Sequence, residues 1–197
     1  MNKWKGLQLN YIKTLNGIFN YDDIESNVLD VESIAHSLSL QCRYGGHVPV
    51  MYSVANHTLG MLDQYVLDHG LYDVKLVTLD HIRVMKQILM HDAGEAYLTD
   101  LMRPIKRLMP EYMEVEKCVD AHIFNFFGLG EKLDIVKEYD NRILADEMIS
   151  FWGESYVDFE PFGRKVEGDP SDFRILKQGF IVTWNAIVEK EKELKNV

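Results

Sequence analysis

The sequence predicts an all-α protein, and three observations lead to that fold class. Apolar residues recur at spacings of three and four along most of the chain, which is the period of an amphipathic helix. The alternation of apolar and polar residues that marks half-buried strands is scarce. The chain has 197 residues, 47% of them hydrophobic, and no low-complexity run. We therefore expect residues 1–197 to form one helical domain.

Two helices are expected before residue 71. Asp30 is of a residue type that favours an N-cap, and the pair Gly45-Gly46 is expected to end the helix that Asp30 begins. The next helix is expected to start at Ser53, to bury apolar residues at helical spacing, and to stop at Gly70. Both helices therefore have start and stop signals in the sequence.

A third helix should begin at Thr78 or Asp80, and the stretch MHDAGEAYL is expected to form its last turns. Pro104 and Pro110 then indicate a turn or kink, because proline is tolerated mainly in the first turn of a helix. The remaining predicted elements are a helix over about 112–127, a helix over about 131–152, an irregular loop over 153–172, and a last helix from Ser171 or Pro170.

Charge and cysteine content exclude several classes of function. A net charge of −10 argues against binding to DNA or RNA, because such proteins neutralise phosphates with basic surfaces. The two cysteines, Cys42 and Cys118, form no disulfide or zinc-ribbon pattern, which favours a reducing compartment. The first residues lack the apolar core of a signal peptide, and no segment has the length of a membrane span. We expect a cytoplasmic protein without a membrane partner.

A group of polar side chains at the end of the third helix indicates metal binding. On a helix, His91 and Glu95 share a face, and Asp92 lies beside them. A mixed set of nitrogen and oxygen ligands suits zinc, manganese, cobalt or iron. His57 and Asp140 are further candidates, because both occur among residues predicted to face the core. In the alternative interpretation, the histidines are hydrogen-bonded core residues and Asp140 pairs with Arg142 or a lysine.

Three stretches of the sequence resemble the HD-domain superfamily of metal-dependent phosphohydrolases. They are IAHSLSLQCRYGGHVPVMYSVANHTLGM, LMHDAGEAYLTDLMRPIK and VKEYDNRILADE, and the similarity covers about residues 31–147. They look like a group of phage and bacterial hydrolases that includes the 5′-deoxynucleotidases and the phage dATP triphosphohydrolases. The resemblance implies a helical HD bundle, one or more zinc, cobalt or manganese ions, and self-association into a homo-oligomer.

The resemblance also assigns roles to residues. It implies that His57, His91, Asp92 and Asp140 are the metal ligands and that Glu95 is the catalytic carboxylate, which orients or deprotonates the attacking water. Asp146 competes with Asp140, but the family pattern matches the aspartate of EYD, so we expect Asp146 to be a surface or capping charge. Asp100 stands where relatives have an aspartate close to the substrate, although it could equally close a turn. The remaining histidines, His36, His47, His69, His81 and His122, have no predicted chemical role.

Arg43, Tyr44 and Lys106 are the other candidates for substrate binding. In relatives an arginine followed by an aromatic residue lies in the substrate pocket, so Arg43 would bind phosphate and Tyr44 would stack on the base. Some relatives have tryptophan in place of Tyr44, which leaves the base preference open. The alternative is that Arg43 complements a helix dipole with Tyr44 packed beside it. Lys106 lies in the densest basic segment, RPIKR, which is either a phosphate-binding patch or a solvated loop.

The expected function is therefore hydrolysis of a deoxynucleotide by metal-activated water. The leading version cleaves a deoxypurine triphosphate such as dATP to the deoxynucleoside and triphosphate. The runner-up is a 5′-deoxynucleotidase that acts on monophosphates. The rival from another class is a non-enzymatic nucleotide-binding module built on the same fold.

Overall fold

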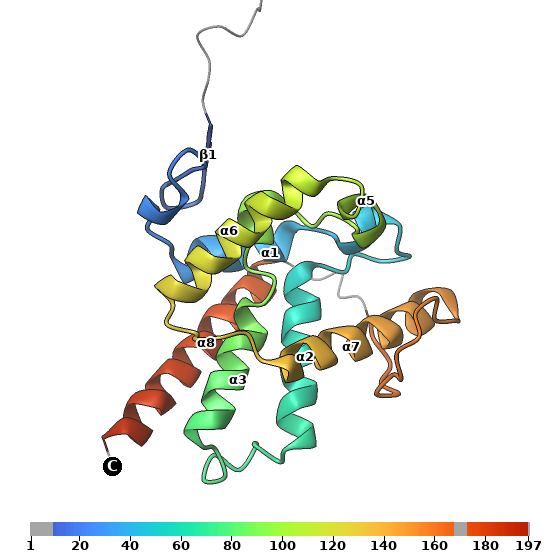
Figure 1. Ribbon diagram of the computed structural model, residues 1–197. Helices are drawn as coiled ribbons and strands as arrows, with labels where there is room; N and C mark the ends of the chain where they lie inside the picture. Colours follow the sequence, from blue (N-terminus) through green and yellow to red (C-terminus); the bar gives the residue numbers. More distant parts are fainter. Residues whose placement is uncertain (1–9, 168–172, 197) are drawn as a thin grey trace, which may run out of the picture.

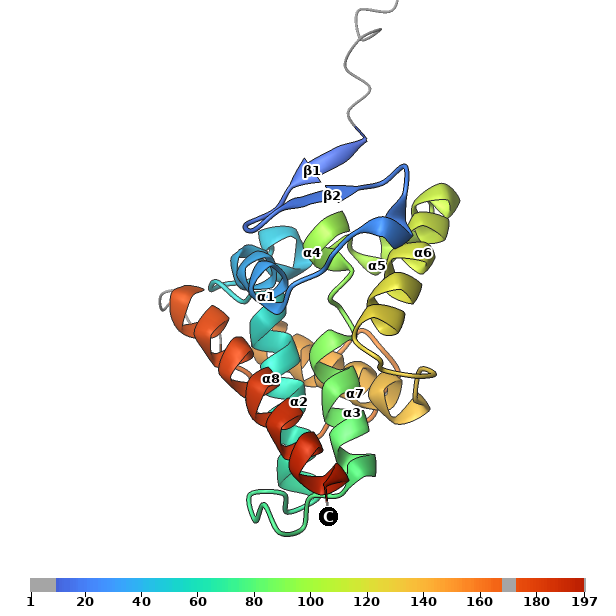
Figure 2. The same cartoon turned by 90° about the vertical axis from the view of Figure 1, so that its left-hand side faces the viewer.

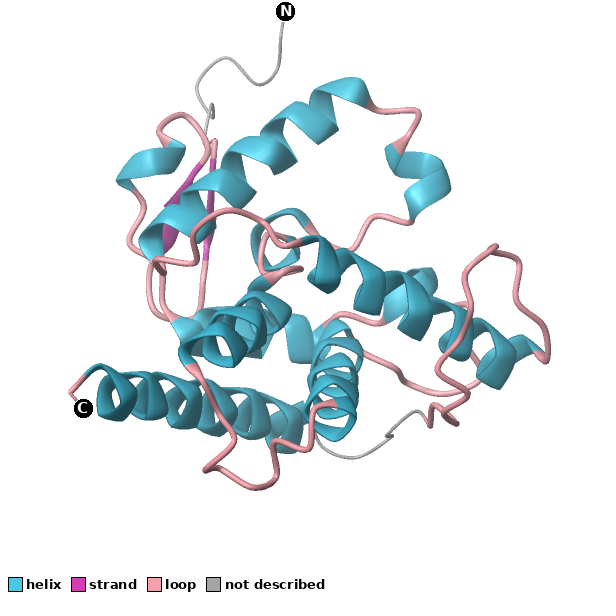
Figure 3. Ribbon diagram, turned by 60° about the horizontal axis from the view of Figure 1, so that its bottom comes forward, coloured by secondary structure: helices cyan, strands magenta, loops and turns pink. Residues whose placement is uncertain are grey.

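The protein is predominantly helical, as the hydrophobic spacing predicts (Figures 1 and 3). The computed structural model describes residues 10–167 and 173–196, and all of its strand residues there belong to one short hairpin. In this hairpin β1 (Tyr11–Lys13) pairs antiparallel with β2 (Ile18–Asn20). Strands of three residues are too short to produce a recognisable alternation, so the sequence analysis did not predict them. None of the helices in the described ranges is both long and apolar enough to cross a lipid bilayer.

Helix α1 (Val31–Leu40) starts where predicted but ends earlier. The side chain of Asp30 accepts a hydrogen bond from the backbone N–H of Ser33, which confirms the N-cap. The predicted end at Gly45-Gly46 is wrong. The Arg43 N–H donates to the carbonyl of Tyr52, so the chain after α1 is drawn into an extended pairing, and a 3₁₀ turn η2 (Arg43–Gly46) follows. A tertiary contact thus overrides local helix signals.

Helices α2 (Val54–Asp68) and α3 (Leu79–Met90) both begin with side-chain caps, from Ser53 and Thr78 respectively, which confirms their predicted starts. The end of the third helix differs from the prediction. After Met90 the backbone makes successive hydrogen bonds from residue i to residue i−3, and a separate short helix, α4 (Glu95–Leu98), follows. The motif MHDAGEAYL therefore leaves the helix at His91 instead of forming its last turns.

The second half of the chain contains the longer helices. Pro104 and Pro110 lie in the first turns of α5 (Arg103–Lys106) and α6 (Pro110–Phe126), as their residue type predicts. Helix α7 (Asp134–Trp152) begins three residues later than predicted and ends at Gly153, which has a φ of 85°. Helix α8 (Phe173–Lys195) is the predicted last helix, but its predicted start at Pro170 or Ser171 lies outside the described residues.

The helices surround one apolar core, and the segments that carry the predicted ligands lie next to one another beside it. Helix α8 packs along α1, α2 and α3, and α7 crosses α2 and α3 (Figures 1 and 2). The fully buried side chains at the centre include Ile34, Met61, Ile88, Ile143 and Phe180. The sequence-distant segments that carry the predicted ligands, α2, the turn after α3, and α7, consequently meet in space.

Gly94 has a steric role in placing this turn. Its backbone is helical, with a φ of −58°, so its conformation does not require glycine. A Cβ atom there would lie 2.6 Å from Oδ1 of Asp120, whose other oxygen accepts a hydrogen bond from Lys132. We expect Gly94→Ala to lower the free energy of unfolding by about 1–3 kcal/mol, because the added methyl group displaces Asp120. Chemical denaturation measures this effect.

Gly60 provides the matched control for that substitution. It lies inside α2, and a Cβ atom built on it meets no other atom within 4 Å. Gly60→Ala should stabilise the protein by about 0.5–1 kcal/mol, because alanine has the higher helix propensity. If both variants were stabilised alike, crowding at Gly94 would not restrict that position.

Candidate metal centre

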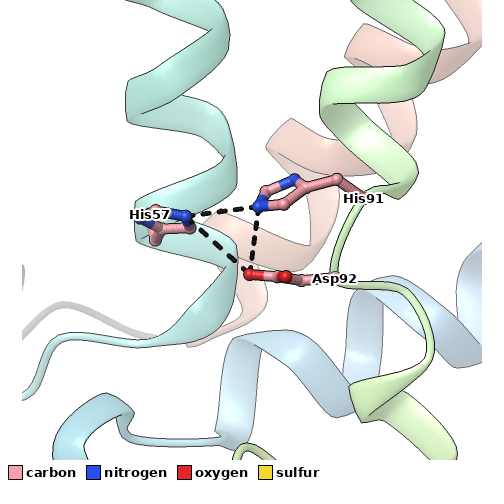
Figure 4. A group of neighbouring side chains, drawn as sticks. All are labelled: His57, His91 and Asp92. Atoms are coloured by element: carbon pink, nitrogen blue, oxygen red, sulfur yellow. Dashed lines mark hydrogen bonds and ion pairs between the residues drawn. The ribbon is translucent and has the colours of Figure 1, made fainter. Parts of the chain in front are cut away.

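Two imidazoles face each other at the centre of the site (Figure 4). His57 projects from α2 and is fully buried, and His91 directly follows α3. Their Nε2 atoms are 3.3 Å apart. Nδ1 of His57 lies 2.6 Å from a carboxylate oxygen of Glu147, and Nδ1 of His91 lies 2.7 Å from the carbonyl oxygen of Ile88. Because these oxygens only accept hydrogen bonds, both Nδ1 atoms carry protons.

Two aspartates complete the group of predicted ligands. Oδ2 of Asp92 lies 3.1 Å from Nε2 of His91 and 3.8 Å from Nε2 of His57. Oδ1 of Asp140 lies 3.4 Å from Nε2 of His57, while its Oδ2 accepts hydrogen bonds of 2.7 Å from Arg103 and from Lys137. Arg142, the other partner considered for Asp140, lies instead 3.5 Å from Glu138. The fold thus directs one oxygen of each aspartate toward the imidazoles.

The space between these four side chains favours a cation. Two imidazoles that are protonated at Nδ1 direct lone pairs at each other, which is unfavourable unless a proton or a metal ion lies between them. Burial and Arg43 lower the pKa of His57, but Glu147 and Asp140 raise it more, to about 9. Nitrogens bound at about 2.0–2.1 Å to a tetrahedral ion lie about 3.3 Å apart. The observed 3.3 Å separation fits that spacing, so the donor set suits a divalent transition metal.

Glu147 is the residue at this site that the sequence analysis missed. It is fully buried on α7 and accepts hydrogen bonds from Nδ1 of His57 and from the hydroxyl groups of Tyr52 and Tyr44. Burial alone would raise the pKa of Glu147, but Arg43 and His57 lower it to about 2. The ionised carboxylate therefore keeps the proton of His57 on Nδ1 and leaves Nε2 for the centre.

Arg43 lies between two carboxylates instead of lying free in a pocket. Its Nη2 is 3.3 Å from Glu147, and its Nη1 is 3.5 Å from Asp92. Its Nε is buried without a hydrogen-bond partner. Tyr44 has a φ of 59°, donates its hydroxyl hydrogen to Glu147, and packs edge-on against Trp152. The two residues thus border the centre and hold its carboxylates in place.

Glu95 lies beside the centre with one oxygen free. The side chain is buried, and its Oε2 has no hydrogen-bond partner. Burial raises the pKa of Glu95 well above its usual range, and the carboxylates of Asp92 and Asp100 raise it further. An unpaired buried carboxyl group costs free energy unless something outside the chain satisfies it, as a substrate or an ordered water would.

Asp100 is held close to Glu95 through one amide side chain. Gln41 donates to the carbonyl of Glu95 and accepts from the backbone N–H of Asp100, both at 2.9 Å. Between them Thr99 has a φ of 71° and a ψ of 152°, a conformation that β-branched residues rarely adopt. Tertiary contacts therefore fix the position of Asp100, whose pKa is raised by burial.

The basic segment after Asp100 contributes two cations at different places. Lys106 is half-buried and forms a 2.5 Å ion pair with Glu116, and the negative charges of Glu95 and Asp92 help to raise its pKa against the effect of burial. Arg103, the first residue of the segment RPIKR, contacts Asp140 directly at 2.7 Å. Arg103 is therefore the cation of this segment that touches a predicted ligand.

Asp146 has a structural role away from the imidazoles. It is buried, and its oxygens accept hydrogen bonds from the backbone N–H groups of Phe162, Gly163 and Arg164. The expectation of a surface or capping charge is wrong, because Asp146 lies buried inside α7 and binds the backbone of a loop instead of the end of a helix. His122 is likewise structural, because its Nε2 lies 2.8 Å from the carbonyl oxygen of Asn27.

Comparison with known proteins gives one informative relative. No family model matches the sequence. The chain is 34% identical over 137 residues to YfdR of Escherichia coli (strain K12), an uncharacterized protein. The aligned region covers 69% of this chain and 68% of the relative.

Proposed function

The chain belongs to the same family as YfdR of Escherichia coli, and from the chemistry of its site we propose that it is a metal-dependent phosphohydrolase of deoxynucleotides. The observation that carries this proposal is the convergence of His57, His91, Asp92 and Asp140, with both Nε2 atoms directed at one point. We further propose that the helical bundle is an HD domain, on the resemblance of its three motifs.

The proposed centre holds zinc, cobalt or manganese, as one ion or more. A divalent ion, when bound, supplies a Lewis acid that polarises a phosphoryl oxygen and lowers the pKa of water. The two imidazoles and Asp92 would hold it, with Asp140 as the fourth ligand. Glu147 and the carbonyl of Ile88 keep both imidazoles in the required orientation and protonation state.

Glu95 has the position and the free oxygen for the proton transfer. In the leading version, the oxygen of water attacks the α-phosphorus of a deoxynucleoside triphosphate, and the bond from that phosphorus to the 5′ oxygen breaks. Triphosphate and the deoxynucleoside are the products. Oε2 of Glu95 orients the water or accepts its proton, and the 5′ oxygen of the leaving deoxynucleoside gains a proton.

The substrate contacts are proposed on the side of Glu95. Arg43 has an unpaired Nε, and its charge acts on Glu95, as do the charges of Asp100 and Lys106. Tyr44 lies beside Arg43. The pKa of Lys106 is raised against the effect of burial, first by Glu116 and then by Glu95 and Asp92, and its positive charge suits contact with phosphate oxygens. Deoxypurine nucleotides are the proposed substrates, and Tyr44 is the proposed contact to the base.

A substrate screen tests the proposed function. The purified protein is incubated with deoxynucleoside mono-, di- and triphosphates and with zinc, cobalt or manganese, and the products are separated by chromatography. We expect release of intact triphosphate from dATP and no turnover in the presence of a chelator. Release of phosphate from monophosphates alone would favour a 5′-deoxynucleotidase. Nucleotide binding without turnover under any of these metals would contradict an enzymatic role.

Glu147 provides a test of the metal centre that does not depend on turnover. Glu147→Gln keeps the shape of the side chain but removes the charge that holds Nδ1 of His57 and offsets Arg43. We expect the affinity for the metal to fall by about ten- to a hundredfold, as measured by calorimetric titration. Since the substitution also removes one of the two carboxylates that face the buried Arg43, the titration is performed below the melting temperature of the variant. Unchanged affinity in the folded variant would contradict the role of Glu147.

A further inference from the structure

A small pocket opens beside the candidate metal centre, on the side of α6 and α7. It has a volume of about 170 Å³, and its wall includes three of the proposed ligands: His91, Asp92 and Asp140. Two lysines, Lys132 and Lys137, line it as well. We call it the lysine pocket. Neither lysine was predicted to have a role from the sequence.

The charges around the lysine pocket depend on the metal. The lining side chains carry two positive charges, from Lys132 and Lys137, and two negative charges, from Asp92 and Asp140. The pocket is therefore close to neutral until a divalent ion adds two positive charges. With the ion bound, the lining would attract an anion that lies next to the centre.

Both lysines can turn toward such an anion at low cost. Lys132 pairs with Asp120 and Lys137 with Asp140, in each case at 2.7 Å, but each lysine side chain is 63% exposed. Each ammonium group therefore stays largely in contact with water, and Asp140 keeps its hydrogen bond from Arg103 when Lys137 turns away. A ligand with several negative charges, positioned beside the ion, would compete successfully for these lysines.

The size of the pocket indicates which part of a substrate it accepts. Sites that enclose a whole small molecule have volumes of about 300–1,000 Å³. A pocket of about 170 Å³ accommodates only part of a nucleotide. The apolar part of its wall includes Phe124, a residue that is 9% exposed and that already has Nζ of Lys132 5.1 Å from the centre of its ring. Phe124 therefore offers little free surface for a base.

We infer that the lysine pocket binds the phosphate groups that follow the one at the metal centre, in a substrate with a polyphosphate chain. This inference rests on the proposed function, and it states where the phosphate end of the substrate binds. It also separates two groups of cations. The charges of Arg43 and Lys106 act on Glu95, whereas Lys132 and Lys137 line the pocket together with Asp92 and Asp140.

Binding of inorganic triphosphate, with inorganic phosphate as the reference, tests the inference without any turnover. Calorimetry is performed on the metal-loaded parent, on Lys132→Ala and on Lys137→Ala. We expect each variant to bind triphosphate about five- to tenfold more weakly, because one charge-assisted contact is lost, and we expect Lys132→Ala to bind phosphate as the parent does. Lys132 touches none of the proposed ligands, so Lys132→Ala should keep the metal content of the parent. Lys192→Ala is the matched control, since Lys192 is 64% exposed and pairs with Glu189 on α8.

Each outcome has a separate meaning for the pocket and for the proposed function. Triphosphate binding that is absent in the parent, or unchanged in both variants, would overturn the inference even if nucleotides are hydrolysed. An equal loss of phosphate and triphosphate binding in Lys132→Ala would also overturn it, because Lys132 would then contact the first phosphate. Metal-dependent triphosphate binding that the variants weaken would support the pocket, and if no nucleotide were hydrolysed, only the proposed enzymatic function would fail.

Discussion

Asp140→Asn is expected to abolish nucleotide hydrolysis and to remove the metal from the purified protein. The substitution keeps the shape of the side chain but removes its negative charge. One oxygen of the carboxylate, Oδ1, lies 3.4 Å from Nε2 of His57. An amide is a much weaker ligand for a transition metal than a carboxylate. Elemental analysis of the purified variant and a turnover assay with added zinc, cobalt or manganese measure the two effects. Alanine at His57, His91 or Asp92 should have the same consequences.

Asp146→Asn is the matched control, because it makes the same chemical change on the same helix. The oxygens of Asp146 accept three backbone hydrogen bonds from residues 162–164 and contact neither imidazole. This variant should lose about 1–3 kcal/mol of stability, because a buried backbone donor loses its acceptor, and should keep its metal content. Loss of metal from Asp146→Asn with full metal content in Asp140→Asn would reverse the assignment of the fourth ligand.

Glu95→Gln should lower kcat by about a hundredfold or more while the metal content and the KM stay close to those of the parent. The amide occupies the same volume but cannot accept a proton from water. The free Oε2 of Glu95 lies beside the centre. The side chain of Glu95 is not part of the close group formed by His57, His91 and Asp92. Steady-state kinetics with dATP, together with elemental analysis, separate the loss of proton transfer from the loss of the ion.

Glu138→Gln is the control for that experiment, since Glu138 is 61% exposed on α7 and pairs only weakly, with Arg142 at 3.5 Å. It should have the kcat of the parent. A normal kcat in Glu95→Gln would show that another group handles the proton. A large loss of metal in the same variant would instead make Glu95 a ligand.

Glu147 shows what the helical period can predict for α7 and what it cannot. The period predicts which residues share a face, but not which of two adjacent acidic residues lies at the site. Glu147 follows Asp140 by seven residues, which is close to two helical turns, so the two carboxylates share one face of α7. This spacing was a signal for a second acidic residue at the site, yet Asp146 and Glu147 are adjacent in the sequence and either could have been exposed. Only the packing of α7 against α2 places Glu147 on His57 and turns Asp146 toward the loop at 162–164.

The sequence by itself determined the fold class and the starts of α1, α2 and α3, and it predicted the four polar side chains that the structure brings together. Helix starts are local, since Asp30, Ser53 and Thr78 cap backbone groups only three residues away. The end of α1 is different, since the residues that follow it pair with a later segment, where the N–H of Arg43 donates to the carbonyl of Tyr52. The tertiary structure alone decided that Arg43 lies between Asp92 and Glu147 and that Arg103 reaches Asp140. It also decided that Lys132 and Lys137 line a pocket beside the centre. The positions of these two lysines depend on how the helices pack against each other. The residues next to a surface lysine in the sequence do not indicate which distant residues it will contact.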